Sequence, residues 1–244
     1  MRRWRCLCSY DGTSYFGWQT QDGQISIQQA IEEALEVVFK KRVSVHGSGR
    51  TDTGVHAEGQ VFHFDFDWEH GPEKLRKAIG SRLSEDIQVY GIEEVDADFH
   101  ARFSAIGKRY RYQFHLGAAG PFQCRYCYSV PEKMDLSAIR SAMDLLLGRH
   151  DFAAFAANRG IEYETTVRTI TKAELNQDSE YVKLSFEADG FMYKMVRTLA
   201  GTLMNVGLAR IGQDEIWRYL ETGKRDAMAF VAPARGLFLE KVFY

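Results

Sequence analysis

The chain has 244 residues, of which 45% are hydrophobic and 26% charged, and its formal net charge is −2 at pH 7. This length allows one large domain or two smaller ones, and the composition is typical of a globular protein with a buried core. No apolar run approaches the roughly 18 residues of a membrane span, and the basic N-terminus lacks the apolar stretch of a secretory signal. We therefore expect a cytoplasmic protein with no membrane association.

Positive charge is concentrated in parts of the chain. Residues 99–131 and 190–213 contain no acidic residue, and between Glu36 and Glu58 the only acid is Asp52. The cations of these stretches are Lys40, Lys41, Arg42, Arg50, Arg102, Lys108, Arg109, Arg111, Arg125, Lys194, Arg197 and Arg210. Segregated positive charge is typical of a phosphate-binding surface, although ordinary solvated surface is the alternative for any single stretch.

The first half of the chain alternates predicted strands and helices. Residues 4–10 read as a strand, and a capping box at Ser26–Gln29 begins a helix. Its apolar residues recur at the helical period: Ile27, Ala30, Ile31, Ala34, Leu35 and Val38. A short strand at 42–46, a half-buried strand at 61–67, a helix near 73–80 and a strand near 87–93 follow.

The second half begins with the clearest strand, 108–116, in which aromatic and basic residues alternate. A helix over 135–147 has Gly148 placed as its C-cap, and strands are predicted near 166–175 and 180–188. A helix over 192–206, a short helix over 213–221 that ends at Gly223, and a strand near 236–243 complete the chain.

Strands that follow one another directly, with helices between groups, predict a mixed α+β fold. We expect a largely antiparallel sheet flanked by helices. The join near 104–107 divides the chain into halves of similar element order, 1–105 and 106–244. The first half carries the Asp52 segment.

Asp52 is the first candidate for chemistry. It lies in the glycine-rich segment 47–56, two residues after Arg50. An ordinary aspartate is negatively charged at neutral pH, so it can act as a nucleophile without a general base. The plain alternative is that it closes a turn. Glycoside hydrolysis is a further alternative, which needs a second carboxylate such as Glu58 or Asp65.

Two further positions could contact RNA. Tyr110 and Tyr112 lie in a stretch where aromatic residues alternate with cations, an arrangement suited to base stacking and phosphate binding. The alternative is that these aromatics face the core. Arg197 lies off the main apolar stripe of its helix, beside Gly201, and would need an anion such as Asp52 if partly buried; otherwise it is a surface side chain.

Cysteine and histidine residues give weaker signals. Cys6 and Cys8 share one face of a strand, which suits packing, and a single Cys124-x-x-Cys127 pair indicates zinc only weakly. The histidines at positions 46, 56, 63 and 100 lack joint ligand spacing and are interpreted as structural. We expect no metal.

The segment 47–56, Gly-Ser-Gly-Arg-Thr-Asp-Thr-Gly-Val-His, resembles the signature of the TruA family of tRNA pseudouridine synthases. The resemblance continues in order through residues 10–19, 59–61, 99–104, 108–112 and 191–197. The sequence departs from the family at two places. Thr53 stands where the family usually has Ala. Residues 81–87 stand where the family usually has an Asn, then Leu-Pro, and then an acidic residue followed by Ile.

This resemblance implies that Asp52 attacks a uridine of tRNA. It implies that Tyr110 contacts the target base and assists removal of the C5 proton, that Arg197 pairs with the aspartate, and that Arg50 helps fill the space left by the extruded nucleotide. It also implies a homodimer without cofactor or metal, acting on the anticodon stem-loop of tRNA. The alternative function is a non-catalytic tRNA-binding or folding protein.

Overall fold

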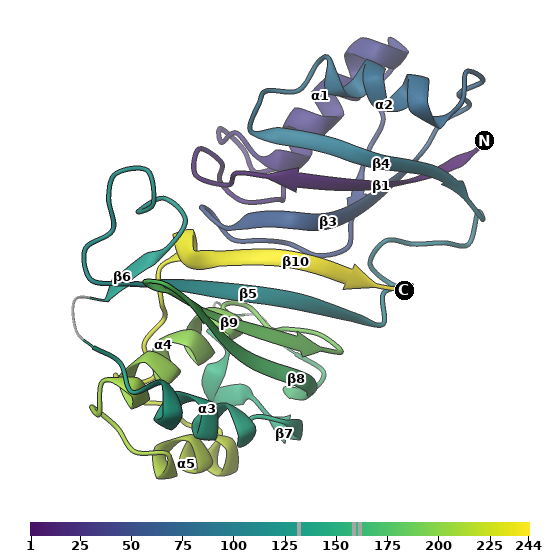
Figure 1. Ribbon diagram of the computed structural model, residues 1–244. Helices are drawn as coiled ribbons and strands as arrows, with labels where there is room; N and C mark the ends of the chain where they lie inside the picture. The colour runs from purple at the N-terminus through teal and green to yellow at the C-terminus, as the bar shows by residue number, and fades with distance from the viewer. Residues whose placement is uncertain (131–132, 158–159, 161–162) are drawn as a thin grey trace. The chain divides into compact units, whose positions relative to one another are not determined.

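The computed structural model divides the chain into two units, and it describes residues 1–130, 133–157, 160 and 163–244 (Figure 1). Unit 1 comprises Met1–Ile106 together with Phe238–Tyr244, and unit 2 comprises Gly107–Leu237. Both units contain a sheet and helices, so the expected α+β fold with a largely antiparallel sheet is confirmed.

Unit 1 is built on a sheet in the order β4-β1-β3-β10, with β2 also paired to β3. Its elements are β1 (Arg3–Tyr10), α1 (Ile27–Phe39), β2 (His46–Gly47), β3 (His56–Asp65), α2 (Pro72–Gly80), β4 (Ile87–Val95) and β10 (Leu237–Phe243). The pairing of β3 with β10 is parallel, whereas the pairs β1–β3, β1–β4 and β2–β3 are antiparallel.

The core of unit 1 follows the predicted alternation. In β1 every second side chain is buried, from Trp4 to Tyr10, and Cys6 and Cys8 are fully enclosed on that face. Ser26 caps α1 by accepting a hydrogen bond from the amide of Gln29. At the other end of α1, the ring of Phe39 stacks on Phe66, with 3.7 Å between the ring centroids.

Two expectations for unit 1 are wrong. Of the expected strand 42–46, only His46 pairs with another strand, as part of the two-residue strand β2, and the Val45 amide donates instead to the side chain of Glu32, at 3.0 Å. The strand expected at 61–67 runs from His56 to Asp65 and is buried on both faces. The His63 side chain on this strand is 2% exposed because Phe99 and His100 cover it.

Unit 2 is built on a sheet in the order β5-β9-β8-β7, all antiparallel, with β6 parallel to β5. Its strands are β5 (Gly107–Leu116), β6 (Tyr128–Val130), β7 (Gly148–Asp151), β8 (Val167–Asp178) and β9 (Tyr181–Ala188). Its helices are α3 (Leu136–Asp144), η1 (Ala153–Phe155), α4 (Met195–Gly207), α5 (Asp214–Thr222) and η2 (Ala234–Gly236).

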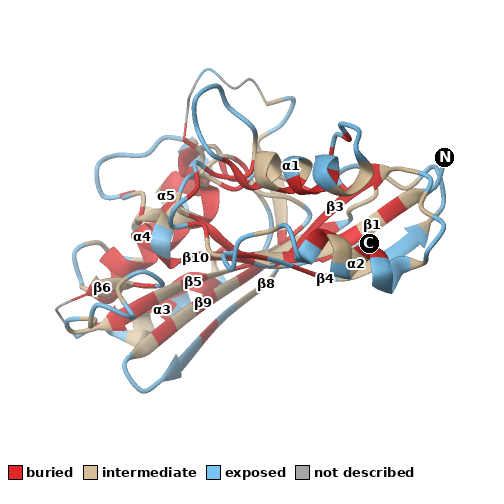
Figure 2. Cartoon of the chain, turned by 90° about the horizontal axis from the view of Figure 1, so that it is seen from above, coloured by how far each residue is buried: buried red, intermediate tan, exposed pale blue. Residues whose placement is uncertain are grey.

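The core of unit 2 lies between this sheet and its helices. Along β5 the aromatic positions are buried and the basic positions between them are half-buried, as the alternation predicts (Figure 2). Nearly every residue of α4 is buried, including its polar Thr198, Thr202 and Asn205.

Two helix boundaries differ from those expected in unit 2. Helix α3 ends at Asp144, and Gly148 begins strand β7 instead of capping a helix, which leaves Leu147 38% exposed. Helix α4 begins at Met195 because Lys194 adopts a left-handed backbone conformation with φ of 59°. The expected C-cap at Gly223 is confirmed.

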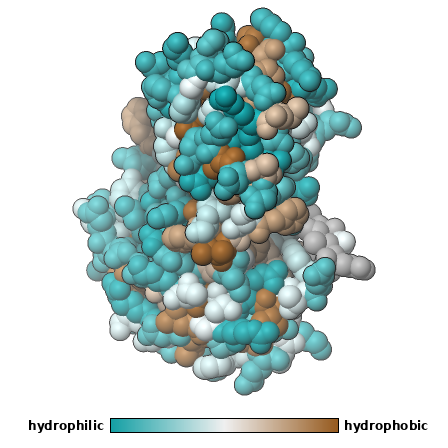
Figure 3. All heavy atoms as spheres, turned by 90° about the vertical axis from the view of Figure 1, so that its right-hand side faces the viewer, coloured by the Kyte–Doolittle hydropathy of each residue, from teal (hydrophilic) through white to brown (hydrophobic). Residues whose placement is uncertain are grey.

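Within the described residues, no helix is both long and apolar enough to cross a membrane. Hydrophilic side chains cover most of the face shown in Figure 3, and apolar ones occur there in small groups.

Candidate active site

Asp52 lies in unit 1, in the segment 47–56 that connects β2 to β3, here called the Asp52 loop. The amide of Val55 donates to the carbonyl of Asp52 at 3.1 Å, and Gly54 has a φ of 74°. Asp52 therefore begins a turn, as the plain alternative predicted. Its side chain is partly exposed. A turn and a chemical role are compatible, because the backbone makes the turn while the carboxylate stays accessible.

The segment from Tyr10 to Trp18 holds this loop through direct backbone contacts. A Cβ atom on Gly12 would lie 2.0 Å from the carbonyl oxygen of Val55, and one on Gly17 would lie 2.5 Å from that of Thr51. The amide of Trp18 donates to the Thr51 carbonyl at 3.1 Å. Only glycine allows so close an approach, so these two glycines fix where the Asp52 backbone lies.

Buried polar side chains fix the two sides of the loop. The hydroxyls of Tyr10 and Thr51 lie 2.9 Å apart, and the Ser48 hydroxyl donates to Gln60 at 2.7 Å. The Gln60 amide in turn donates to the carbonyl of Gly49 at 3.1 Å. The sequence interpretation missed this network, although three adjoining stretches, 10–19, 47–56 and 59–61, all belong to the resemblance.

Arg50 is the exposed cation of the same loop. Its Nε atom donates to the side chain of Gln19 at 3.0 Å, which ties the guanidinium to the segment that also holds the loop backbone. The sequence placed Arg50 near Asp52, and the structure adds Gln19 as the residue that orients it.

Tyr110 lies in unit 2 on β5 and is 8% exposed. Its ring meets the edge of Phe191, with 5.2 Å between centroids. Its neighbour Tyr112 is fully buried, donates its hydroxyl proton to the carbonyl of Pro233 at 2.8 Å, and has a pKa raised strongly by burial. Tyr112 is therefore a core residue, as the alternative predicted, and Tyr110 is the candidate of the two.

Arg197 projects from α4 in unit 2 and is half-buried. Its Nε atom donates to the carbonyl of Ala232 at 2.8 Å, and the Ala232 amide returns a bond to the Arg197 carbonyl at 3.1 Å. The plain alternative, a solvated surface arginine, is wrong because the side chain is anchored to the fold.

A segment without regular secondary structure, residues 228–232, holds Arg197 from one side and is here called the strap. Asn205, Gly201 and Arg197 recur every four residues along α4. They meet Met228, Phe230 and Ala232 in turn: Asn205 donates to the Met228 carbonyl at 2.8 Å, and a Cβ on Gly201 would lie 1.9 Å from the Phe230 oxygen. The glycine inside the helix thus has a packing reason, which is contact with a strap instead of a second helix.

One of the two carboxylates named for glycoside hydrolysis, Asp65, does not suit that chemistry. Asp65 is held by Arg3 through two hydrogen bonds of 2.7 Å, and these lower its pKa. A general acid must hold a proton at neutral pH, so this pairing opposes the role. Glu58 is exposed on β3.

The cysteines and histidines were the candidates for metal ligands. All four cysteines are free thiols, with Cys6, Cys8 and Cys127 buried. In the part of the chain that the structure describes, no group of three or more His, Cys, Asp or Glu side chains is arranged to hold a metal ion.

The four candidates divide between the units, with Arg50 and Asp52 in unit 1 and Tyr110 and Arg197 in unit 2. Each is fixed by contacts within its own unit: the Tyr10–Trp18 segment for the first pair, and Phe191 and the strap for the second.

Comparison with known proteins identifies the family. The family model described as tRNA pseudouridine synthase matches residues 7–104 and 142–244. The chain is 40% identical over 244 residues to tRNA pseudouridine synthase A of Exiguobacterium sibiricum, covering 100% of this chain and 97% of that protein. It is 41% identical over 248 residues to tRNA pseudouridine synthase A 1 of Protochlamydia amoebophila, with 100% and 97% covered.

A chain in the crystal structure of a Cbf5-Nop10-Gar1 complex aligns with a TM-score of 0.37 and 12% identity, over 83% of this chain and 53% of that one, which is too weak a likeness to support any statement. The family model and the full-length relatives agree with each other across both units. The chain therefore belongs to the tRNA pseudouridine synthase family.

Proposed function

We propose that this protein converts uridine to pseudouridine in the anticodon stem-loop of tRNA, with Asp52 as the nucleophile. As a member of its family it is an isomerase. The finer assignments, which are the stem-loop and the aspartate, rest on the sequence signature and on the geometry of the Asp52 loop.

The reaction needs only rearrangement of one nucleotide. The bond between ribose C1′ and base N1 breaks, the base turns, and C1′ joins C5, which then loses its proton while N1 gains one. A carboxylate can promote this by adding to C1′ of the sugar or to C6 of the base, and it leaves unchanged at the end. No electrons enter or leave, so the overall change requires no redox partner.

One observation carries the proposal: a partly exposed carboxylate sits on a backbone that two glycine contacts and a buried hydrogen-bond network hold in place. A nucleophile must be held near its attack position, and preorganised groups contribute most to catalysis.

The other candidates keep the roles that the resemblance implies. Tyr110 contacts the extruded base and assists loss of the C5 proton, Arg197 pairs with the Asp52 carboxylate, and Arg50 fills the space that the nucleotide leaves. Extruding a base costs about a few kcal/mol of stacking energy. In this proposal residues 1–105 carry the nucleophile, residues 106–244 supply RNA-contacting groups, and the protein acts in the cytoplasm as a homodimer.

Replacing Asp52 tests the proposal directly. The substitution Asp52→Asn keeps the size of the side chain but removes the nucleophilic charge, so tRNA should still bind while isomerisation stops. Release of tritium from tRNA labelled at uridine C5 measures the reaction, and filter binding measures the affinity. Asp22→Asn, at an exposed position outside the Asp52 loop, is the matched control and should behave as the wild type.

An Asp52→Asn protein that releases tritium at the wild-type rate would overturn the assignment of the nucleophile. If wild type and variant both bind tRNA and neither releases tritium, the protein is a non-catalytic tRNA binder instead.

A further inference from the structure

Phe122 is the most exposed large apolar side chain among the described residues, with 86% of its surface accessible. It lies on the connection between β5 and β6, residues 117–127, here called the Phe122 loop. The candidate site does not use this loop. A benzene ring left in water gains nothing for folding, so its position invites a functional explanation.

The Phe122 loop is a structured turn. The amide of Gly117 donates to the carbonyl of Val130 at 2.8 Å and closes the base of the loop. Within it, the amides of Gln123 and Cys124 both donate to the carbonyl of Gly120, at 3.1 and 2.9 Å.

A buried side chain anchors the far end of the loop. Cys127 is 0% exposed, and its thiol donates to the Gln123 carbonyl at 3.1 Å. The ring of Phe122 is therefore presented by a backbone that is already ordered, which lowers the entropy lost on binding a partner.

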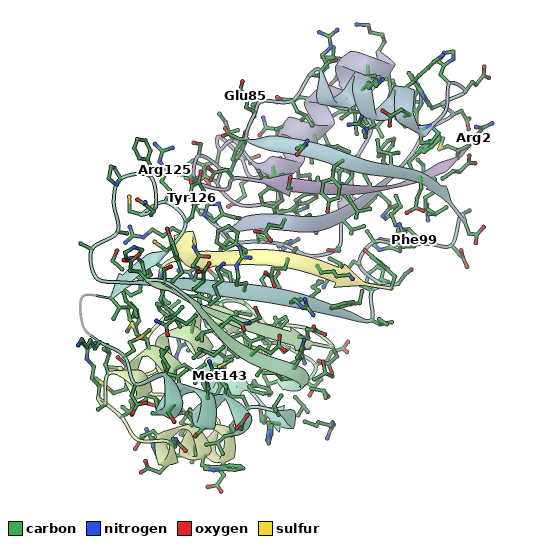
Figure 4. The ribbon with its side chains drawn as sticks, in the orientation of Figure 1. Arg2, Glu85, Phe99, Arg125, Tyr126 and Met143 are labelled. Carbon is green, nitrogen blue, oxygen red and sulfur yellow. The ribbon has the colours of Figure 1, made fainter. Side chains whose placement is uncertain are left out.

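Polar and cationic residues follow Phe122 in the loop, whereas Pro121 before it is apolar. Arg125 is exposed, Tyr126 is 36% exposed, and both lie on this loop beyond the ends of β5 and β6 (Figure 4). The surrounding stretch, 99–131, contains no acidic residue. Aromatic rings beside an arginine, in a stretch of sequence without acidic residues, match the pattern by which proteins bind unpaired nucleotides.

We propose that the Phe122 loop binds RNA: an unpaired base stacks on the ring of Phe122, and Arg125 contacts a neighbouring phosphate. The inference rests on the proposed function in taking tRNA as the ligand. It adds a contact that holds the substrate outside the residues of the candidate active site.

The charge of the loop favours RNA over a protein partner. A protein-docking patch usually has a contiguous apolar core. Here Phe122 is followed in the chain by Gln123 and, after Cys124, by Arg125. Stacking needs only the flat face of one ring, and the arginine supplies charge complementary to a phosphate.

Three substitutions at one position separate stacking from simple apolar contact. Phe122→Trp keeps a ring, Phe122→Leu keeps only apolar surface, and Phe122→Ala removes both. We expect the Kd for tRNA to rise at least about fivefold in the Leu and Ala variants, because neither side chain offers a ring on which a base can stack. In the Trp variant, which keeps a ring, the Kd should stay near the wild-type value. The value of kcat at saturating tRNA should not change.

Trp217→Ala is the matched control. Trp217 is also an exposed aromatic of unit 2, at 46%, but it lies on α5 beside Asp214 and Glu215. Its removal should leave the Kd for tRNA unchanged. Arg125→Gln should weaken tRNA binding. It should also lower the slope of log Kd against log salt concentration by about the amount that one phosphate contact contributes.

The proposal is overturned if Phe122→Ala binds tRNA as tightly as wild type, or if Phe122→Leu does. It is also overturned if sedimentation shows that Phe122→Ala changes the oligomeric state, since the ring would then contact another copy of the chain. Failure of the isomerase proposal gives a separate result. In that case the wild-type protein would release no tritium, however tightly the Phe122 variants bind tRNA.

Discussion

His63 is the side chain whose protonation the structure opposes most clearly. Its ring is buried, and the rings of His46 and His100 lie 5.0 and 4.7 Å from it between centroids. Its Nδ1 atom accepts a hydrogen bond from the amide of Ala101, at 3.2 Å. Burial first, then the two neighbouring histidines and Arg3, lower the pKa of His63 to about 4, and Asp65 only partly offsets them.

We predict that the free energy of unfolding decreases as the pH falls from about 6.5 to about 4. The ordinary pKa of histidine is near 6.5. In this window the unfolded chain binds a proton at His63 that the folded chain does not, so acid favours unfolding, by up to about 2 kcal/mol from this residue. Urea unfolding at several pH values measures the effect.

The substitution His63→Gln removes the titrating ring while keeping an oxygen that can accept from Ala101. Its unfolding free energy should depend less on pH across this window. His70→Gln, at an exposed histidine, is the control and should keep the wild-type pH dependence. Equal pH dependence in His63→Gln and wild type would contradict the explanation.

At the scale of elements, the Asp52 loop depends on its contact with the Tyr10–Trp18 segment. We predict that Gly17→Ala displaces the loop, because its added Cβ would lie 2.5 Å from the Thr51 carbonyl oxygen. The free energy of unfolding should fall by about 2 kcal/mol or more, and tritium release should slow by at least about tenfold, since a small misplacement of a nucleophile is costly.

Gly23→Ala separates crowding from backbone strain. Gly23 also has a positive φ, 72° against 82° for Gly17, but no atom lies within 4 Å of its added Cβ. It should lose about 1 kcal/mol of stability from strain alone and keep its activity. If both variants lose activity equally, the close contact is not what positions Asp52.

Periodicity in the sequence was enough to predict most of the regular elements. The strands β1 and β5 and the helices α1 and α2 match their expected ranges closely, because one face of each is buried and the other is not. The pattern failed where local chemistry decides the boundary. Gly148 and Gly223 both follow helical patterns, yet only Gly223 caps a helix.

Less of the candidate site than of the fold could be predicted from the sequence. The signature placed Asp52 and Arg50 on one loop, and that placement needed no tertiary information. The strap on α4 could not be foreseen, because residues 228–232 carry no regular period, and the atoms that accept hydrogen bonds from Arg197 and Asn205 are backbone carbonyls. Every residue has a backbone carbonyl, so the amino-acid sequence does not reveal which carbonyls accept these hydrogen bonds.

At the scale of the whole molecule, charge distribution matters more than the net value of −2. We predict that the affinity for tRNA falls steeply with salt concentration, because cations in the acid-free stretches replace counterions on the phosphates. The slope should be about −0.9 for each phosphate contacted. Arg109 should contribute little, since Glu187 on the neighbouring strand holds it in an ion pair.

Binding measured at several potassium chloride concentrations gives this slope. Arg102→Gln, at an exposed arginine of the stretch 99–131, should make the slope shallower by about one contact. Arg149→Gln, at an exposed arginine on β7 outside these stretches, should not. An affinity that does not change with salt would show that charge does not drive the association.

Unit 1 is discontinuous in the chain: residues 238–244 return to it after the whole of unit 2. Strand β10 pairs with β3 at His56 and Ala57, and Gly59 makes room for the Glu240 carbonyl oxygen, which would lie 2.2 Å from any Cβ there. During translation the sheet that flanks the Asp52 loop therefore emerges with one edge open, and more than a hundred residues must be synthesised before the closing strand arrives. An open edge strand is prone to pair with other chains. Assembly of the sheet around Asp52 is thus a late event in biogenesis, even though Asp52 itself emerges early.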